Sequence, residues 1–390
     1  MKVVLVAEAW GRHEMQFSHA LVGPSGRELT LQIGISGLAP YMQVLCHKCK
    51  QQTRFLQAHC EHCQEHIWPN EFDLIAHWKN LRDQHGIAVT NVFNMRPFVD
   101  PLVPSNSSND LGHLFGDTPT TPMPSWKASK KLGGSHLKPE HFHHIERLWR
   151  ELGDLKPNLI IALGNCSCWA LLGQTKITAL RRTVSRTDTE LTGLDLKVLP
   201  TFHPAAILHQ QAMRPTAIAD MTKATREAKF PEIRRPERWI LIADPDPRGL
   251  ADGYSWFQRP ATAYAVDIET YRGQITMVGF ARSESDALVV MLRNEGQNYW
   301  PTSDLEFQAW KLIQFGLNTP QAKIFQNGVY DLSYFLRMGL KVRNAAHDTM
   351  LWHHSEYPEL PKSLGFLGSI YANEVAWKSM VRHNTLKRDE

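Results

Sequence analysis

The sequence predicts an α/β protein made of two domains, each with a sheet covered by helices. Short runs rich in valine, isoleucine and leucine alternate with segments of helical character, a pattern typical of parallel sheets. The length of 390 residues fits two or three domains of about 150 residues each. Residues 229–238 are rich in proline and charge, and we expect them to link two domains.

The composition excludes several classes of protein. Apolar residues make up 43% of the chain and charged residues 21%, which argues against a mainly disordered protein. No apolar run approaches the roughly 18 residues that span a bilayer, so we expect no membrane association. Glu8 interrupts the apolar start of the chain, which therefore predicts a strand and not a secretory signal. The net charge of +4 permits nucleic-acid binding without requiring it.

The first domain is expected over residues 1–228. Runs of apolar and β-branched residues predict strands at residues 2–7, 87–93, 158–163 and 197–201. The segments between them predict helices at residues 25–35, 72–85, 139–153, 166–172 and 213–228. A stretch dense in proline, serine, threonine, asparagine and glycine predicts a long loop at residues 100–136.

An insertion at residues 40–69 carries two Cys-x-x-Cys pairs separated by ten residues. Each pair can offer two thiolates to one ion from a tight turn, and two pairs complete a tetrahedron. The spacing therefore predicts a structural zinc ribbon, because four thiolates leave no open coordination position. The expected ligands are Cys46, Cys49, Cys60 and Cys63. A redox-active Cys-x-x-Cys is the alternative, which the duplicated pair disfavours.

Three motifs follow predicted strands, at the carboxyl ends where α/β sheets place ligands. The first is Ala-Glu-Ala-Trp-Gly-Arg-His-Glu at residues 7–14, followed by Leu-Val-Gly-Pro-Ser-Gly at residues 21–26. The second is Val-Thr-Asn-Val-Phe-Asn-Met-Arg-Pro at residues 89–97, and the third is Leu-Pro-Thr-Phe-His-Pro-Ala at residues 199–205. In this order they resemble the uracil-DNA glycosylase superfamily, most closely its iron–sulfur class and the relatives fused to phage DNA polymerases.

The resemblance implies that this domain flips a uracil out of DNA and cleaves its glycosidic bond. It implies that Asn91 reads the polar edge of the base and that His203 stabilises the departing uracil anion. It also implies that Glu14 places water or stabilises the sugar cation. The expected substrate-binding residues are Glu8, Trp10, Gly11, Leu21, Gly23, Gly26, Pro204 and Leu208. For Leu208, a wedge into the duplex and packing in the core stay open as alternatives.

The motifs depart from the family pattern at four positions. Ala7 replaces a glycine, Trp10 a proline, and Leu21 the phenylalanine that stacks on uracil. Stacking on one base contributes about 1–3 kcal/mol, so its loss predicts weaker uracil binding unless Trp10 substitutes. Met95 replaces a cluster-ligating cysteine and no cysteine precedes Glu8, so we expect no iron–sulfur cluster.

The second domain is expected over residues 239–390. The same criteria predict strands at residues 263–268, 276–281 and 287–291, and helices at residues 305–315 and 331–338. Asp267 and Glu269 lie two residues apart on a strand, so both carboxylates project from one face. Asp331 ends the motif Asn-Gly-Val-Tyr-Asp. Three such carboxylates predict a site for Mg²⁺ or Mn²⁺, where two ions would bind a phosphodiester and activate water.

These motifs resemble the 3′→5′ exonuclease domain of family A DNA polymerases, which implies a ribonuclease H-like fold. The resemblance adds Asn327 to the expected substrate-binding residues. The family has a third motif with a fourth acidic ligand, but in this chain Asp389 lies one place too far from His383. The missing motif predicts weak or absent exonuclease activity in the isolated chain.

The two resemblances imply a hydrolase acting on single- or double-stranded DNA in phage-type replication or repair. The chain would be the N-terminal part, or a separate subunit, of a family A DNA polymerase. Its expected location is the cytoplasm, that of the host cell if a phage encodes it. Two alternatives stay open: a catalytically weak module for DNA binding or replisome docking, and a sensor that binds uracil without cutting.

Overall fold

The computed structural model describes residues 1–55, 59–97, 111–116, 136–234 and 237–372. They form two compact units: residues 1–233, joined by those from 367 onward, and residues 234–366. Both units combine a sheet with helices, so the predicted α/β class is confirmed. Within the described ranges, no helix is long and apolar enough to cross a bilayer.

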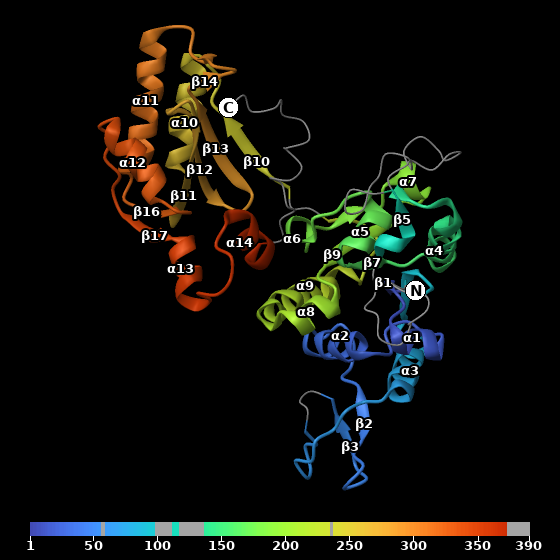
Figure 1. The fold of residues 1–390 in the computed structure, drawn as a ribbon. Coiled ribbons are helices and arrows are strands. Elements are labelled where there is room, and N and C mark those ends of the chain that lie inside the picture. Colours follow the sequence, from blue (N-terminus) through green and yellow to red (C-terminus); the bar gives the residue numbers. More distant parts are fainter. Residues whose placement is uncertain (56–58, 98–110, 117–135, 235–236, 373–390) are drawn as a thin grey trace. The chain divides into compact units, whose positions relative to one another are not determined.

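The first unit is built on a five-stranded sheet in the order β4-β1-β7-β9-β8 (Figure 1). Its strands are β1 (Val3–Ala9), β4 (Ile87–Phe93), β7 (Leu159–Leu163), β8 (Ser185–Arg186) and β9 (Lys197–Thr201). The pairs β1–β4, β1–β7 and β7–β9 are parallel, and the two-residue β8 pairs antiparallel with β9. The carboxyl ends of the four parallel strands β4, β1, β7 and β9 therefore lie along one edge of the sheet, as the sequence predicted.

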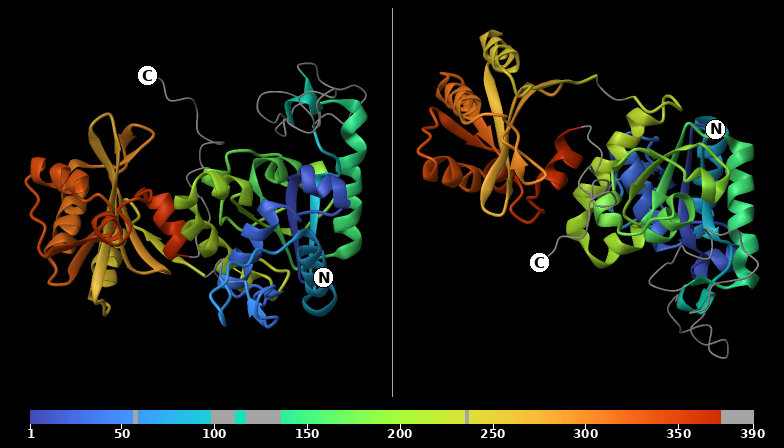
Figure 2. Two further views of the ribbon diagram at one scale, coloured as in Figure 1. Left: turned by 60° about the horizontal axis from the view of Figure 1, so that its bottom comes forward. Right: turned by 90° about the horizontal axis from the view of Figure 1, so that it is seen from above.

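Helices cover both faces of this sheet (Figure 2). Val3 and Leu5 of β1 enter one core, together with side chains from α2, α3 and α9. Val4 and Val6 enter the other core, together with side chains from α4 and α5. A strand buried on both faces needs apolar residues at every position, which explains why its sequence does not alternate.

The helices of the first unit are α1 (Arg12–Phe17), α2 (Pro24–Ile35), α3 (Glu71–Asn80), α4 (Phe142–Leu155), α5 (Gly164–Leu172), α6 (Ile177–Leu180), α7 (Thr189–Thr192), α8 (Pro204–His209) and α9 (Arg214–Glu227). The helix predicted at residues 72–85 is instead an α-helix that continues as a π-helical turn, Leu81–His85. Four helices of four to six residues were not predicted, because so short a segment shows no helical period.

Two segments interrupt the α/β pattern of the first unit. In the predicted cysteine insertion, β2 (Gln43–Leu45) and β3 (Gln52–Arg54) form an antiparallel hairpin. Most of the predicted long loop, residues 98–110 and 117–135, lies outside the described residues. The described part corrects the prediction, since β5 (Phe115–Gly116) pairs with β6 (His136–Leu137).

The second unit contains a six-stranded sheet in the order β10-β13-β12-β11-β16-β17. Its strands are β10 (Trp239–Ile242), β11 (Ala263–Tyr271), β12 (Gln274–Ser283), β13 (Asp286–Met291), β16 (Ala322–Phe325) and β17 (Ala345–Asp348), and β14 (Arg293–Asn294) and β15 (Gln297–Asn298) form a separate hairpin. The central strands β11, β12 and β13 are antiparallel, whereas the other pairs are parallel.

The helices of the second unit are α10 (Pro247–Gln258), α11 (Ser303–Asn318), α12 (Val329–Arg337), α13 (Thr349–Glu356) and α14 (Leu364–Tyr371), whose last residues count with the first unit. Val266 and Ile268 of β11 are buried against side chains of α10 and α11. The alternate residues Asp267 and Glu269 are exposed on the opposite face. The packing of this sheet therefore decides which face of β11 carries carboxylates.

Candidate active sites and metal centre

The three motifs of the first unit meet at one edge of its sheet. β1 ends at Ala9 beside the end of β4, where Ala7 pairs with Asn91. On the other side of β1, β7 leads to β9, where Leu163 pairs with Thr201 just before His203. Asn91 thus lies near the end of β4, and the segments with Glu14 and His203 leave β1 and β9 at the same edge of the parallel sheet.

Asn91 is a fully buried amide at this edge, with 1% of its surface exposed. Neither its side-chain nitrogen nor its side-chain oxygen has a hydrogen-bond partner among the residues that the structure describes. Buried polar groups are nearly always paired, because an unpaired one loses its hydrogen bonds to water. An amide with a free donor and a free acceptor is therefore suited to a ligand that offers both.

The backbone that presents Asn91 is held by Arg147 of α4. Its Nη2 donates to the carbonyl oxygens of Asn91 and Val92, the latter at 3.3 Å. Its Nη1 donates to Glu151 Oε2 at 2.6 Å, and the hydroxyl of Thr90 donates to the same oxygen at 3.0 Å. The end of β4 is thus fixed while the amide of Asn91 stays free.

Glu14 lies in α1 and is buried against two glycines. Its Oε1 accepts a hydrogen bond from the Gly23 backbone N–H at 3.2 Å. A Cβ atom at Gly11 would lie 2.5 Å from Glu14 Oε2, so a side chain there would displace the carboxylate. Gly11 and Gly23 therefore fix the position of Glu14.

Leu21 packs in the core of the first unit, with 2% of its surface exposed and a φ of 55°. Its carbonyl oxygen accepts from Trp78 Nε1 at 2.9 Å and would lie 1.8 Å from a Cβ at Gly26. Glycine is therefore needed at position 26, because a side chain there would collide with the backbone turn at Leu21. Trp10 is half-buried, and its backbone N–H donates to the carbonyl of Met95 at 3.1 Å, which joins the first two motifs.

His203 precedes α8 as its N-cap, and its Nδ1 accepts from the Ala205 backbone N–H at 3.2 Å. This bond assigns the proton of the neutral ring to Nε2. Burial lowers the pKa of His203 to about 4, so the ring is neutral at pH 7. Gly164, with a φ of 87°, makes room for it, since a Cβ there would lie 3.0 Å from His203 Cβ.

The remaining predicted residues of this edge differ in exposure. Pro204 is buried, whereas Leu208 is 39% exposed on α8 and is not part of a core cluster. Burial raises the pKa of Glu8, whose carboxyl acts electrostatically on the buried Cys166 of α5. Glu8 therefore faces the interior of the unit.

The four cysteines of the insertion lie together at the ends of two matching turns. Cys46 Sγ is 3.6 Å from Cys63 Sγ, Cys49 Sγ is 3.6 Å from Cys60 Sγ, and all four sulfurs lie within 4.8 Å of one another. Zinc–sulfur bonds of about 2.3 Å in a tetrahedron require sulfurs about 3.8 Å apart, so the cluster fits one zinc ion. Among the described residues, no other group of three or more histidine, cysteine or acidic side chains is as close.

In the second unit, Asp331 at the start of α12 is buried next to β11. Its Oδ1 accepts from the Ile268 backbone N–H at 3.1 Å. Burial, and then the charge of Asp267, raise the pKa of Asp331 to about 6. The carboxylates of Asp331 and Asp267 repel each other when both are charged. Their oxygens are of the kind that divalent cations bind, and a bound cation would offset this repulsion.

Asn327 and Gly328 form a turn that Asp348 braces. Asn327 has a φ of 58°, and its backbone N–H donates to Asp348 Oδ1 at 3.2 Å. Gly328 N–H donates to Asp348 Oδ2 at 2.7 Å, and Met350 N–H to Oδ1 at 2.8 Å. Asp348 thus positions the turn before α12. The stretch expected to hold the third motif, residues 383–389, lies outside the described residues.

Sequence reasoning missed Arg147 and Glu151, and it predicted a turn at Gly164 without assigning this glycine to the site. An arginine and a glutamate four residues apart on a helix look like a surface pair, so nothing in the sequence separates this pair from a solvated one. Gly164 carries the weak signal that glycine directly after a buried strand indicates a tight turn.

The comparisons with known proteins found one family model and several solved structures. The family model described as Uracil DNA glycosylase superfamily matches residues 1–227. No curated protein matches the chain. Among solved structures, Escherichia coli RNase D, an exoribonuclease involved in structured RNA processing, is 18% identical with a TM-score of 0.27. The match covers 38% of this chain and 36% of that one.

The EXD2 exonuclease domain, soaked in Mg and dGMP, is 16% identical with a TM-score of 0.24, and the match covers 39% of this chain and 79% of that one. The same domain soaked in Mn and GMP is 15% identical with a TM-score of 0.22, and the match covers 35% of this chain and 70% of that one. The chain thus spans about a third of the length of RNase D.

Proposed function

The chain belongs to the uracil DNA glycosylase superfamily through residues 1–227, and on this premise we propose that its first unit excises uracil from DNA. The observation that carries the proposal is the buried amide of Asn91, whose two polar atoms are both unpaired as far as the described residues go. A uracil offers an acceptor and a donor side by side on one edge, which an amide can match with two hydrogen bonds.

The cleavage would use a neutral histidine as hydrogen-bond donor. As the glycosidic bond breaks, negative charge develops on the uracil, and His203 Nε2–H donates to its oxygen. Glu14, held by Gly23, stabilises the positive charge that develops on the sugar or orients the attacking water. Glu8, Trp10, Gly11 and Leu208 surround the base and its strand.

The test uses an end-labelled single-stranded oligonucleotide with one uracil, incubated in EDTA and then treated with alkali. We expect a single break at the uracil that falls at least a hundredfold in His203→Ala and in Asn91→Ala. His209→Ala, at the exposed far end of α8, is the matched control and should keep full activity. Uracil-specific binding without a break would establish the sensor alternative instead, and neither binding nor a break would favour a docking module.

We propose that the second unit is a weak metal-dependent 3′→5′ exonuclease. Its expected ligands for Mg²⁺ or Mn²⁺ are Asp267, Glu269 and Asp331, and the raised pKa of Asp331 beside Asp267 supports the proposal. The ions would supply activation of water and stabilisation of the phosphate, while Asn327 contacts the 3′ end of the strand.

Incubation of a 3′-extended oligonucleotide with Mg²⁺ should give a slow ladder from the 3′ end that Asp267→Ala abolishes. Asp252→Ala, a change to an exposed carboxylate on α10, is the control and should leave the ladder intact. Vigorous degradation would contradict the expected weakness. Absence of both the ladder and Mn²⁺ binding would contradict the site itself.

We propose that the four cysteines hold a structural zinc ion. Elemental analysis should find one zinc per chain, which Cys60→Ser lowers and Cys168→Ser, in the core outside the ribbon, leaves unchanged. Much less than one zinc in the unmodified chain would overturn the assignment.

The resemblance to phage proteins supports a broader proposal, that the chain works in the cytoplasm with, or as part of, a family A DNA polymerase. Co-purification of the native protein with polymerase activity tests this setting. Recovery of the native protein alone, with no polymerase activity in the same fraction, would argue against it.

A further inference from the structure

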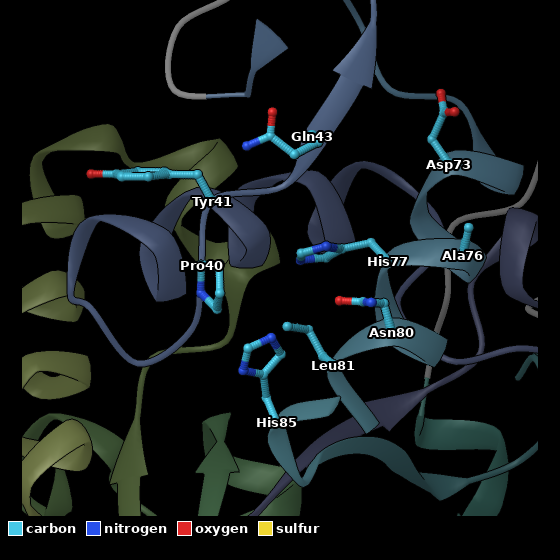
Figure 3. A pocket seen from close by; sticks show the side chains of 9 residues that line it. All are labelled: Pro40, Tyr41, Gln43, Asp73, Ala76, His77, Asn80, Leu81 and His85. Atoms are coloured by element: carbon cyan, nitrogen blue, oxygen red, sulfur yellow. The ribbon is translucent and has the colours of Figure 1, made fainter. Parts of the chain in front are cut away.

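A cavity of ≈ 360 Å³ lies in the first unit between the entry to the cysteine hairpin and helix α3 (Figure 3). It shares no residue with the proposed glycosylase site or the four-cysteine site. Its walls include Pro40, Gln43, His77, Asn80, Leu81 and His85. Its volume falls within the roughly 300–1,000 Å³ of typical small-molecule sites.

Polar side chains converge on this cavity from the helix. In Figure 3, His77, Asn80 and His85 extend from α3 and its π-helical turn toward the segment that carries Pro40. His77 Nε2 is buried and has no hydrogen-bond partner within the described part of the chain. Burial, and then the charge of His85, lower the pKa of His77 to about 4, so its ring is neutral at pH 7.

The backbone around the cavity is built to hold this arrangement. The π-helical turn widens the end of α3 at Leu81–His85 and stops at Gly86, which has a φ of 68°. Such turns are frequent at functional sites. Next to His77 on α3, the buried Trp78 donates to the carbonyl of Leu21, which anchors the helix to the core.

The lining excludes several kinds of ligand. Of the residues that the structure describes, no lysine or arginine lines the cavity, which disfavours a phosphate or another anion. The described lining includes two histidines, which do not join a third described ligand to form a metal-binding group. Asp73 caps its own helix, with Oδ2 accepting from the Asn70 N–H at 2.9 Å, and Figure 3 shows it turned away from His77. A neutral, polar ligand remains.

We propose that this cavity binds a nucleobase, either as a free nucleoside or as an unpaired base of single-stranded DNA. The amides of Gln43 and Asn80 and the imidazole of His77 match the mixed donors and acceptors of a base edge. Pro40 and Leu81 contact its apolar face. The choice of DNA as a source of the base rests on the proposed function of the chain. Binding of a base in this cavity does not require an active glycosylase site.

Calorimetric titration of the full chain with each deoxynucleoside, and with a short oligonucleotide free of uracil, tests the proposal. We expect saturable binding of one base type that weakens at least tenfold in His77→Leu and in Asn80→Ala. Lys79→Ala, an exposed change on the same helix, should leave it unchanged. Tighter binding of the oligonucleotide than of the nucleoside would identify single-stranded DNA as the source of the base. Equal binding of the two would identify a free nucleoside as the ligand.

The Asn91→Ala variant separates this cavity from the glycosylase site. Base binding that persists in Asn91→Ala supports the proposal even if no uracil is excised. Binding lost in Asn91→Ala but kept in His77→Leu and Asn80→Ala would overturn it. Absence of binding by any nucleoside or oligonucleotide, or a Ni²⁺ ion bound through His77 and His85, would also overturn it.

Discussion

Single buried polar residues of this chain differ in whether the fold satisfies them. Lys197 is fully buried, yet its ammonium donates to the carboxylate of Glu227 and to the carbonyls of Glu227 and Glu232, at 3.1, 2.8 and 3.0 Å. Asn91 is equally buried, and the described residues offer its side-chain amide no such partners. Because folding favours paired groups, Lys197 is explained by structure alone, whereas the unpaired amide of Asn91 is the observation on which the proposed uracil site rests.

Arg147→Met should impair uracil binding through Asn91. Without its hydrogen bonds to the carbonyls of Asn91 and Val92, the end of β4 can shift, and a shift of about 1 Å can cost up to a hundredfold in rate. We expect the inhibition constant of free uracil to rise about tenfold or more, with unchanged affinity for an abasic oligonucleotide. Arg150→Met, exposed on the same helix, is the control. An equal loss of both affinities would indicate a structural role only.

Asp331→Asn should stabilise the metal-free second unit at pH 7.5. The pKa of Asp331 is raised from 3.8 to about 6, so the folded state binds more protons than the unfolded state between these values. Stability is therefore lost as the pH rises through this window, by up to about 3 kcal/mol for two pKa units. We expect a higher melting temperature for the variant in EDTA at pH 7.5 and no difference at pH 3.5. A lower melting temperature at pH 7.5 would contradict the assigned sign.

Among the elements, those with long apolar patterns were predictable. The strand Lys197–Thr201 was predicted with its observed bounds, and helix α4 was predicted within three residues of its ends. By contrast, β16 and β17 have four residues each and contain lysine, histidine or aspartate, so they show no strand pattern. The strand ends that carry the candidate sites were predicted because motifs and topology agree there.

The cavity beside α3 was not predictable, for a different reason. It depends on a π-helical turn and on an approach between residues 40–43 and α3 that no local pattern encodes. The role of Arg147 likewise depends on where α4 meets β4. Tertiary contacts between distant segments thus account for most of what the sequence did not predict.

Gly26→Ala should destabilise the start of α2. The added Cβ would lie 1.8 Å from the carbonyl oxygen of Leu21, and backbone cannot move aside as a flexible side chain can. We expect a loss of about 1–3 kcal/mol in the free energy of unfolding, the range for overpacked interiors. Gly116→Ala, whose nearest neighbour is the Lys138 side chain at 3.8 Å, should be nearly neutral. Equal stability of the two variants would show that the turn at Leu21 adapts.

At the scale of the whole molecule, the two units have separate hydrophobic cores. Among the described residues, the three hydrophobic clusters of the first unit contain only residues up to 233, and the cluster of the second unit contains only residues 241–342. Glu14, Asn91 and His203 lie in the first unit, whereas Asp267, Glu269 and Asp331 lie in the second.

Separate cores predict that the two proposed activities can be removed one at a time. On a single oligonucleotide with one internal uracil, His203→Ala should lose the alkali-sensitive break and keep the Mg²⁺-dependent shortening from the 3′ end. Asp267→Ala should show the reverse, because its carboxylate lies on an exposed strand face of the second unit and supports no part of the first core. Melting curves of both variants should match the unmodified chain to within a few degrees, which excludes unfolding as the cause. If either change removed both products while the protein stayed folded, the units would share one active site, and the assignment of one reaction to each would be wrong.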